Sequence, residues 1–358
     1  EDLIRDRVSC LVGSEMCIRD RCTGSDTGGS LRMPAALCGV VGYRPSVDVI
    51  AHPTRPLGWS GISVLGPMAR TVDDLTLMLD VCQGYDADDP LTAPSVTGRF
   101  AELPSTNLKD LRVGFSEDFG GAPVEQSIRE TFRARLEVLR PQVKECRAAD
   151  LDLGDMDRCF DILRAESFGV AFGEAVARDP DSFGAHIKDN VALGQTMSLA
   201  DRGWAHAEQT QILRKFNSLM AEFDVIVLPT SPVSPFVWTE PYVEVIDGQT
   251  MDIYYRWLAL CYRGSLTGGP SITLPCGRDT AGMPFGLQVL GPLRGDDGLL
   301  SAAKAMEGLF EHSEQTTRPL ADLERLPHSD VDLRSIVTHP ADLSAGLATP
   351  NATLRTAV

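Results

Sequence analysis

The chain has 358 residues, of which 43% are hydrophobic and 23% are charged, a composition typical of a soluble globular protein with a large apolar core. Its formal net charge of −17 argues against direct binding to nucleic acids and to anionic membranes, since both select basic surfaces, and its apolar runs fall short of the roughly 20 residues of a membrane span. The nine cysteines contain no CxxC pair and the six histidines have no metal-binding spacing, so we expect a reduced, cytoplasmic protein without metal or cofactor.

The first 22 residues differ from the rest of the chain. Charged residues interrupt every apolar run, so that neither a two-residue nor a 3.6-residue period is present. The segment 17–22 is also too charged for the buried strand that usually precedes a nucleophile loop in an α/β enzyme. We interpret residues 1–22 as a non-native leader that resembles translated sequencing-adapter read-through, with a genuine divergent N-terminal arm as the alternative.

Beyond residue 22, apolar patterns typical of strands alternate with patterns typical of helices, which indicates an α/β sheet protein. The clearest helix start is at Thr71, which can cap a helix whose first turn contains Asp73 and Asp74. Asp224–Thr230 is the clearest buried strand of the parallel type. The polar, unpatterned residues 321–358 predict a weakly ordered tail. The expected helices are 34–38, 71–82, 124–139, 158–178, 199–222, 252–264 and 299–310; the expected strands are 39–45, 111–115, 224–230, 271–275 and 284–292.

The stretch Gly24–Arg32 combines three glycines, three hydroxyl side chains, one acid and one arginine. Consecutive glycines allow a turn in which several backbone N–H groups converge on one point. Acyl transfer needs a nucleophile and hydrogen-bond donors for the developing oxyanion. We therefore predict that Ser30 is a nucleophile and that the oxyanion donors are the backbone amides of Thr27, Gly28, Gly29 and Ser30.

Asp26 and Arg32 carry opposite charges on the two sides of this turn, and we expect them to pair and to hold the loop. From the loop alone, a simple turn between elements stays open. A P-loop is excluded because no Gly-Lys-Ser/Thr follows, and a GxSxG elbow because Arg32 occupies the last glycine position. The turn of an aspartic protease would need a second Asp-Thr-Gly, which the sequence lacks.

The loop and a series of later blocks together resemble the amidase signature family. The resemblance implies an α/β fold in which helices sandwich a large mixed β-sheet, over residues 23–320, with the N-terminal part of the family's domain missing. It also implies an amidase that hydrolyses carbon–nitrogen bonds of small-molecule amides through an acyl-enzyme on Ser30. The matching blocks are 24–35, 38–46, 66–75, 224–230, 267–271, 275–277 and 282–288.

The family hydrolyses amides with a Ser–Ser–Lys triad, of which only the nucleophile has a counterpart in this chain, at Ser30. The position of the second serine falls at Arg5–Arg7, and Ser25 lies too close to Ser30 to replace it. The first lysine is Lys109, which we interpret as a solvated surface charge. A serine hydroxyl without a base is a poor nucleophile, so we expect a C-terminal fragment of an amidase with little or no turnover.

The resemblance also implies that loops around Trp59, Cys261 and Thr267 contribute to substrate binding, although each side chain can equally serve packing. A homodimer stays open. Two other functions are considered. One is the glutaminase component of a tRNA-dependent amidotransferase, against which the segment Leu199–His206 lacks the expected Tyr-Asp-Ala-Tyr-Tyr-like stretch. The other is a non-catalytic remnant that binds ligands or partners.

Overall fold

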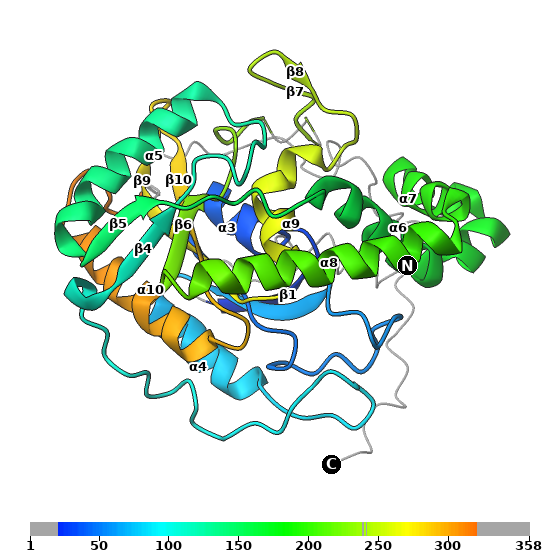
Figure 1. Ribbon diagram of the computed structural model, residues 1–358, viewed down its shortest axis with the longest axis horizontal. Helices are drawn as coiled ribbons and strands as arrows, with labels where there is room; N and C mark the ends of the chain where they lie inside the picture. Colours follow the sequence, from blue (N-terminus) through cyan, green and yellow to red (C-terminus); the bar gives the residue numbers. More distant parts are fainter. Residues whose placement is uncertain (1–20, 238–239, 241, 321–358) are drawn as a thin grey trace, which may run out of the picture. The chain divides into compact units, whose positions relative to one another are not determined.

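An eight-stranded mixed β-sheet lies at the centre of the residues that the structure describes (Figure 1). This computed structural model describes residues 21–320 except 238, 239 and 241, so most of the expected leader and the expected tail 321–358 lie outside the described residues. Strand β4 pairs in parallel with both neighbours, and the other pairings are antiparallel. In sheet order the strands are β1 (Arg21–Asp26), β3 (Val64–Ala69), β2 (Val41–Arg44), β9 (Ser271–Arg278), β10 (Pro284–Leu290), β6 (Val225–Pro229), β4 (Arg112–Phe115) and β5 (Glu145–Ala148).

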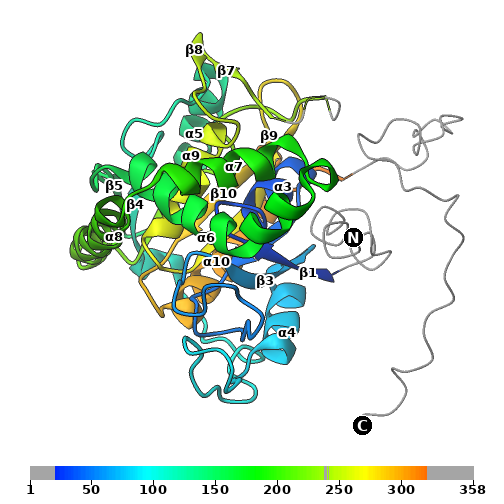
Figure 2. The same ribbon diagram turned by 90° about the vertical axis from the view of Figure 1, so that its right-hand side faces the viewer.

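Helices cover both faces of this sheet. Successive residues of β2 point to opposite faces, and each face meets a different helix. A β-carbon placed on Gly42 would meet Ala35 of α3, whereas the Tyr43 hydroxyl donates to Asp296 at the start of α10. Helices α3 and α10 therefore lie on opposite faces (Figure 2). The helices are α3 (Arg32–Cys38), α4 (Val72–Cys82), α5 (Gln126–Leu139), α6 (Met156–Arg178), α7 (Ala185–Thr196), α8 (Leu199–Met220), α9 (Ala259–Leu266) and α10 (Asp296–Glu311).

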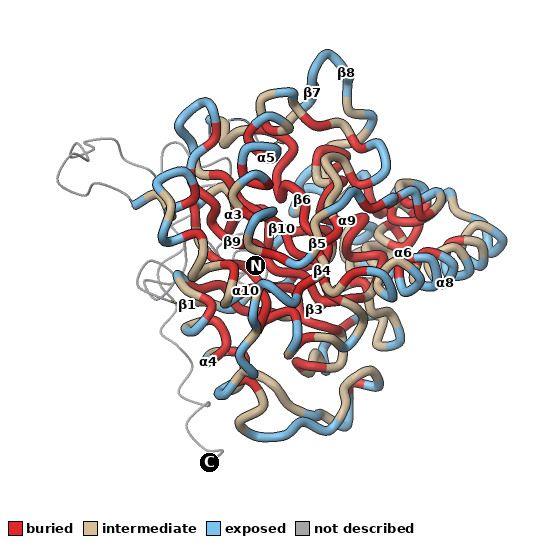
Figure 3. Tube along the Cα trace, turned by 60° about the vertical axis from the view of Figure 1, so that its left-hand side comes forward, coloured by how far each residue is buried: buried red, intermediate tan, exposed pale blue. Residues whose placement is uncertain are grey.

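The apolar core follows the central strands. All five residues of β6 are buried, whereas only Ala205, Ile212 and Phe216 are buried along α8, whose outer turns are exposed (Figure 3). A two-stranded ribbon, β7 (Val245–Ile246) with β8 (Gln249–Thr250), stands apart from the large sheet. The longest described helices are too polar to cross a lipid bilayer.

The expected α/β architecture with a large mixed sheet is confirmed, and the helix start at Thr71 is as the sequence predicts. The Thr71 hydroxyl accepts a hydrogen bond from the Asp74 amide, as an N-cap does. Several elements escape the sequence pattern, among them α7, β5 and β3. In α7 only Asn190, Val191 and Gly194 are buried, β5 is a partly exposed edge strand, and Gly66-Pro67 obscures β3.

The segment before the glycine loop contains a strand that the sequence pattern does not indicate. Its charges predict no buried strand at 17–22; β1 begins at Arg21 and runs to Asp26, paired antiparallel with β3. β1 is the last strand in the order of the described sheet, and Arg21 and Cys22 are only partly buried. Such an edge position tolerates charge, and the Arg21 guanidinium pairs with Asp74 of α4 at 2.9 Å. The loop therefore follows a strand that lies at the edge of the described sheet and is only partly buried.

Candidate active site

The glycine loop connects the end of β1 to the start of α3 and is packed closely against α6 and α9. Gly29 has φ +124°, a conformation that favours glycine, and a β-carbon there would lie 2.5 Å from Cys261 Cβ. A β-carbon on Gly28 would lie 2.7 Å from Phe160 Cζ. The Gly29 carbonyl accepts from the Met33 amide at 2.7 Å, which leads the chain directly into α3. The close contacts with Phe160 of α6 and Cys261 of α9 therefore leave no room for a side chain at Gly28 or Gly29.

Ser30 is exposed, although the residues on both sides of it are buried. Gly28 and Gly29 before it and Leu31 and Arg32 after it are all buried. Among the described residues, no hydrogen bond occupies the Ser30 hydroxyl. The loop thus presents one hydroxyl group outward from a buried base.

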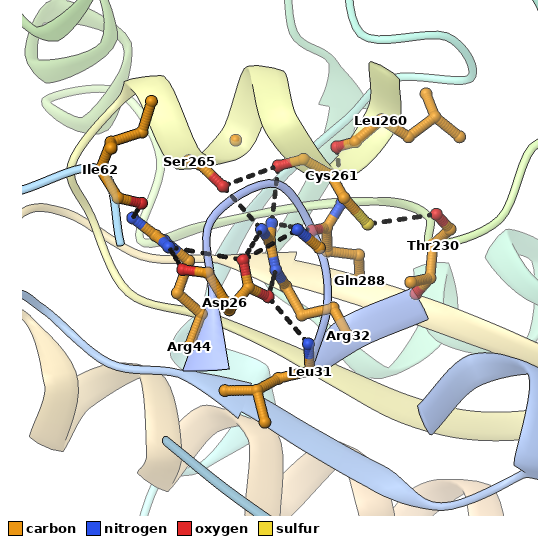
Figure 4. Close-up of polar contacts among 12 residues, drawn as sticks. Asp26, Leu31, Arg32, Arg44, Ile62, Thr230, Leu260, Cys261, Ser265 and Gln288 are labelled. Carbon is orange, nitrogen blue, oxygen red and sulfur yellow. Dashed lines mark hydrogen bonds and ion pairs between the residues drawn. The ribbon is translucent and has the colours of Figure 1, made fainter. Parts of the chain in front are cut away.

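Asp26 holds the base of the loop through both carboxylate oxygens (Figure 4). Its Oδ1 accepts from the Gly29 amide at 2.8 Å, and its Oδ2 accepts from the Leu31 amide at 3.2 Å. Burial alone would raise the pKa of Asp26, but the charges and hydrogen bonds of Arg32 and Arg44 bring it well below its usual value. The acid is therefore ionised at neutral pH and fastens the two amides that flank Ser30.

Arg32 is fully buried and uses all five of its N–H donors. Nε and Nη2 form a bidentate pair with the Asp26 carboxylate, at 3.0 and 2.9 Å. Burial alone would lower the pKa of Arg32, but the charge of Asp26 raises it. The guanidinium thereby ties the loop to α9 and β10. Its other acceptors are the Cys261 carbonyl (2.8 Å), Gln288 Oε1 (2.7 Å) and Ser265 Oγ (2.7 Å).

Arg44 on β2 provides a second buried cation beside the same acid. Its Nη1 donates to the Asp26 carbonyl, and its Nη2 donates to the carbonyls of Gly61 (3.4 Å) and Ile62 (3.0 Å). Arg44 therefore connects the glycine loop to the segment that precedes β3. Arg44 and Gln288 lie in blocks that resemble the amidase signature family, but the sequence does not indicate that they contact the loop, and Ser265 lies outside these blocks.

The four amides predicted as oxyanion donors differ in their surroundings. The Gly29 amide already donates to Asp26 Oδ1. Among the described residues, the amides of Thr27, Gly28 and Ser30 have no hydrogen-bond acceptor. Three of the four predicted donors therefore have no hydrogen-bond partner among the described residues.

The three predicted substrate-binding residues lie in very different environments. Trp59 is 83% exposed, whereas Cys261 and Thr267 are buried. Cys261 Sγ donates to the Thr230 carbonyl, and burial raises the pKa of this thiol to about 12. The Thr267 hydroxyl donates to the Gly264 carbonyl at the end of α9. Cys261 and Thr267 thus make these hydrogen bonds with backbone carbonyls inside the protein.

Lys109, the first lysine of the sequence, is exposed and donates from Nζ to the Pro141 carbonyl. This contact joins two surface turns at the start of β4 and the end of α5. Over the described ranges, no group of three or more His, Cys, Asp or Glu side chains is arranged to hold a metal ion.

Comparison with known proteins gives a consistent family. The profile of the Amidase family matches residues 11–300. The A subunit of the glutamyl-tRNA(Gln) amidotransferase of Lysinibacillus sphaericus is 31% identical over 318 residues, covering 82% of this chain and 64% of that protein. The corresponding protein of Microcystis aeruginosa is 30% identical over 311 residues, covering 79% and 62%. This chain therefore spans less than two thirds of the length of these curated relatives.

Solved structures show the same fold. A bacterial aryl acylamidase of the amidase signature family matches with a TM-score of 0.73 at 22% identity, covering 81% of this chain and 62% of that one. A 6-aminohexanoate cyclic dimer hydrolase, solved with its substrate, matches with a TM-score of 0.67 at 21% identity, covering 81% and 64%. At these identities the similarity establishes the fold alone.

Proposed function

This chain belongs to the amidase family, and we propose that it is the portion of an amide hydrolase that carries the nucleophile, Ser30. The observation that carries the proposal is the exposure of Ser30 on a loop whose neighbouring residues are buried, next to three backbone amides that have no acceptor among the described residues. In the proposed reaction the Ser30 oxygen attacks the carbonyl carbon of a small amide. The carbon–nitrogen bond then breaks, the amine leaves with a proton, and water hydrolyses the resulting ester.

The amides of Thr27, Gly28 and Ser30 are the proposed oxyanion donors. Removing one such donor from a hydrolase typically costs about 2.7–4 kcal/mol of transition-state stabilisation, so the amides must be held in place before the charge develops. Asp26 and Arg32 supply this support, because they fix the Gly29 and Leu31 amides on either side of Ser30. Their proposed role is to position the loop rather than to contact the substrate.

We also propose that this chain alone has little turnover. Activation of a serine requires a proton acceptor, and the sequence has no lysine before Lys109, which is occupied at a distant surface turn. An oxyanion hole and a binding site without the triad retain a residual rate enhancement of about 10³–10⁴. We likewise assign no counterpart to the bridging serine of the family. Ser25, the other serine of the segment 24–32, lies on β1.

The glutaminase component of a tRNA-dependent amidotransferase is the second candidate. The two relatives named above, at 31% and 30% identity, favour it. In that case the substrate is glutamine and the chain works with protein partners. The absence of a Tyr-Asp-Ala-Tyr-Tyr-like stretch at Leu199–His206 favours the small-amide hydrolase. We place either enzyme in the cytoplasm, where buried thiols such as Cys261 and Cys276 stay reduced. A homodimer remains our alternative to a heteromeric partner.

Hydrolysis assays test the proposal on a panel of simple aliphatic amides, anilides and glutamine. We expect residual hydrolysis no greater than about 10⁴-fold above the uncatalysed rate, and it should be similar in Ser30→Ala, because the oxyanion hole and binding alone sustain it. The nucleophile is tested by mass spectrometry after incubation with an activated aryl ester: we expect an acyl adduct on Ser30 that is lost in Ser30→Ala but not in Ser25→Ala, the matched exposed serine. An adduct that persists in Ser30→Ala contradicts the nucleophile. Fast turnover that disappears in Ser30→Ala supports Ser30 as the nucleophile but contradicts the proposal that this chain lacks a general base. Protein partners that co-purify with the chain favour the glutaminase.

A further inference from the structure

Arg55 is a buried arginine whose hydrogen-bonding capacity is only partly used. It lies in the segment between β2 and β3, and its side chain is 3% exposed. Its Nη1 donates to Asp89 Oδ1 at 3.2 Å and to the Gly58 carbonyl at 3.3 Å. Among the described residues, Nε and Nη2 have no acceptor although both are buried.

Asp89 does not fill this edge, because its carboxylate is committed to backbone groups. Asp89 Oδ2 accepts from the His52 amide at 2.8 Å, and Oδ1 accepts from the Leu91 amide at 3.0 Å. Arg55 shares Oδ1 through a single nitrogen, so the pair is not the bidentate one that Arg32 makes with Asp26. Asp89 therefore fastens two loops together and leaves Nε and Nη2, along one edge of the Arg55 guanidinium, buried and without an acceptor among the described residues; we call this the open edge.

The open edge has the geometry of a carboxylate receptor. Nε and Nη2 lie along one edge of the planar guanidinium, and their parallel N–H bonds match the two oxygens of a carboxylate. A buried donor without an acceptor is costly, and a charged one especially so. Burial lowers the pKa of Arg55 from its ordinary value, while the charge of Asp89 opposes this shift. An anion on the open edge would remove both penalties.

The surrounding buried charges also favour an anion. Arg32 and Arg44 both pair with Asp26, Arg55 pairs with Asp89, and the charge of Arg55 acts on Arg44, so these five buried groups carry one positive charge in excess. Burial lowers the pKa of Arg44 to about 10; Asp26 opposes this, and the neighbouring charges of Arg32 and Arg55 add to it. The group consists of Asp26, Arg32, Arg44, Arg55 and Asp89.

We propose that the Nε and Nη2 edge of Arg55 binds a carboxylate, either that of a small free acid or the acid group of an amide substrate. The second source rests on the proposed function and restricts its substrates to amides that carry a carboxylate. The site is connected to the glycine loop, since Arg44 holds both Asp26 and the carbonyls of Gly61 and Ile62 at the end of the segment that contains Arg55. Because Nε and Nη2 are buried, this segment must shift to admit the carboxylate, and Arg44 transmits the shift to Asp26 at the base of the glycine loop.

Nuclear magnetic resonance of the arginine Nε–H groups in the full chain tests the proposal. The Arg55 signal is assigned by its loss in Arg55→Lys, which keeps the charge beside Asp89 but removes the two-donor edge. Sodium propanoate, sodium succinamate and neutral propanamide are titrated at an ionic strength held constant with sodium chloride. We expect a saturable shift of the Arg55 signal with the two carboxylates and none with propanamide. Arg135, a buried arginine whose Nε donates to the Cys276 carbonyl, is the matched control and should not shift.

Binding measured by calorimetry completes the test. We expect Arg55→Lys to weaken propanoate at least about tenfold, as loss of a bidentate contact implies, and Arg135→Lys to leave it unchanged. If succinamate binds more tightly than propanoate, the carboxylate belongs to an amide substrate. If the two bind equally, the site takes a small free acid. Either result supports the site. An Arg55 signal that does not saturate, or carboxylate binding unchanged in Arg55→Lys, overturns it. Ser30→Ala should bind propanoate normally, so failure of the nucleophile is distinguishable from failure of this site.

Discussion

Replacing Arg32 by methionine is the most direct test of how the loop is held. The substitution keeps much of the side-chain volume but removes the bidentate partner of Asp26, whose remaining cation is Arg44. Removing one member of a buried ion pair typically costs about 3–5 kcal/mol, and the acceptors Gln288 and Ser265 each lose a hydrogen bond to a charged donor as well. These terms are not additive, and we expect a loss of at least about 4 kcal/mol in the free energy of unfolding.

Urea unfolding at pH 7 measures this loss, with Arg112→Met as the matched control. Arg112 also pairs with an aspartate, Asp224, but both side chains are 35% exposed, and exposed pairs contribute about 1 kcal/mol or less. If Arg32→Met and Arg112→Met lose similar stability, the buried pair does not hold the loop. A loss below about 1 kcal/mol in Arg32→Met refutes the reasoning in the same way.

Three further substitutions test separate parts of the fold by urea unfolding. Burial raises the pKa of Glu307 to about 7, above its unfolded value near 4.5, so the folded state binds a proton more tightly than the unfolded state does. The free energy of unfolding therefore falls as pH rises from about 4.5 to 7. Glu307→Gln, which still accepts from the Val72 amide, should remove about 2–3 kcal/mol of this fall. Gly29→Ala should lower the free energy of unfolding by about 2–5 kcal/mol, because Gly29 has a positive φ and its added β-carbon would meet Cys261. The control Gly203→Ala, in open space on α8, should raise the free energy of unfolding by up to about 1 kcal/mol. Equal effects of the two substitutions would contradict the close packing of the loop. Gln288→Leu should cost about 1–3 kcal/mol, since Arg32 loses an acceptor and the Leu260 carbonyl loses a donor, and an unchanged stability argues that the loop does not need β10.

The parts of the fold that the sequence predicts are those with a local physical cause. Thr71 and Asp74 lie three residues apart, so their cap is visible in the sequence, and the uniformly apolar strand at Val225–Pro229 requires burial on both faces. Strand β1 is missed because charges rule out a buried strand but not an edge strand. Helix α7 is missed because its few buried residues leave no apolar stripe.

The candidate site is predictable only in part for the same reason. The loop itself is local, and its glycines and serine mark it in the sequence. The groups that support it are not local: Arg32 reaches acceptors on α9 and β10 that lie 229 to 256 residues further along the chain. No spacing rule connects such positions, so only the folded structure brings Gln288 and Ser265 to the loop.

Arg32 and Arg55 show how one side-chain type serves two purposes within this part of the fold. Both are buried, and each contacts one aspartate. Arg32 has an acceptor for every donor, so no ligand can bind it without breaking a contact that holds the loop. Arg55 has two buried donors, Nε and Nη2, for which Asp89 and the other described residues provide no acceptor. A buried charge that is fully satisfied acts as a support, whereas one left open is kept for an anion from outside the chain, and this contrast is what the propanoate titration measures.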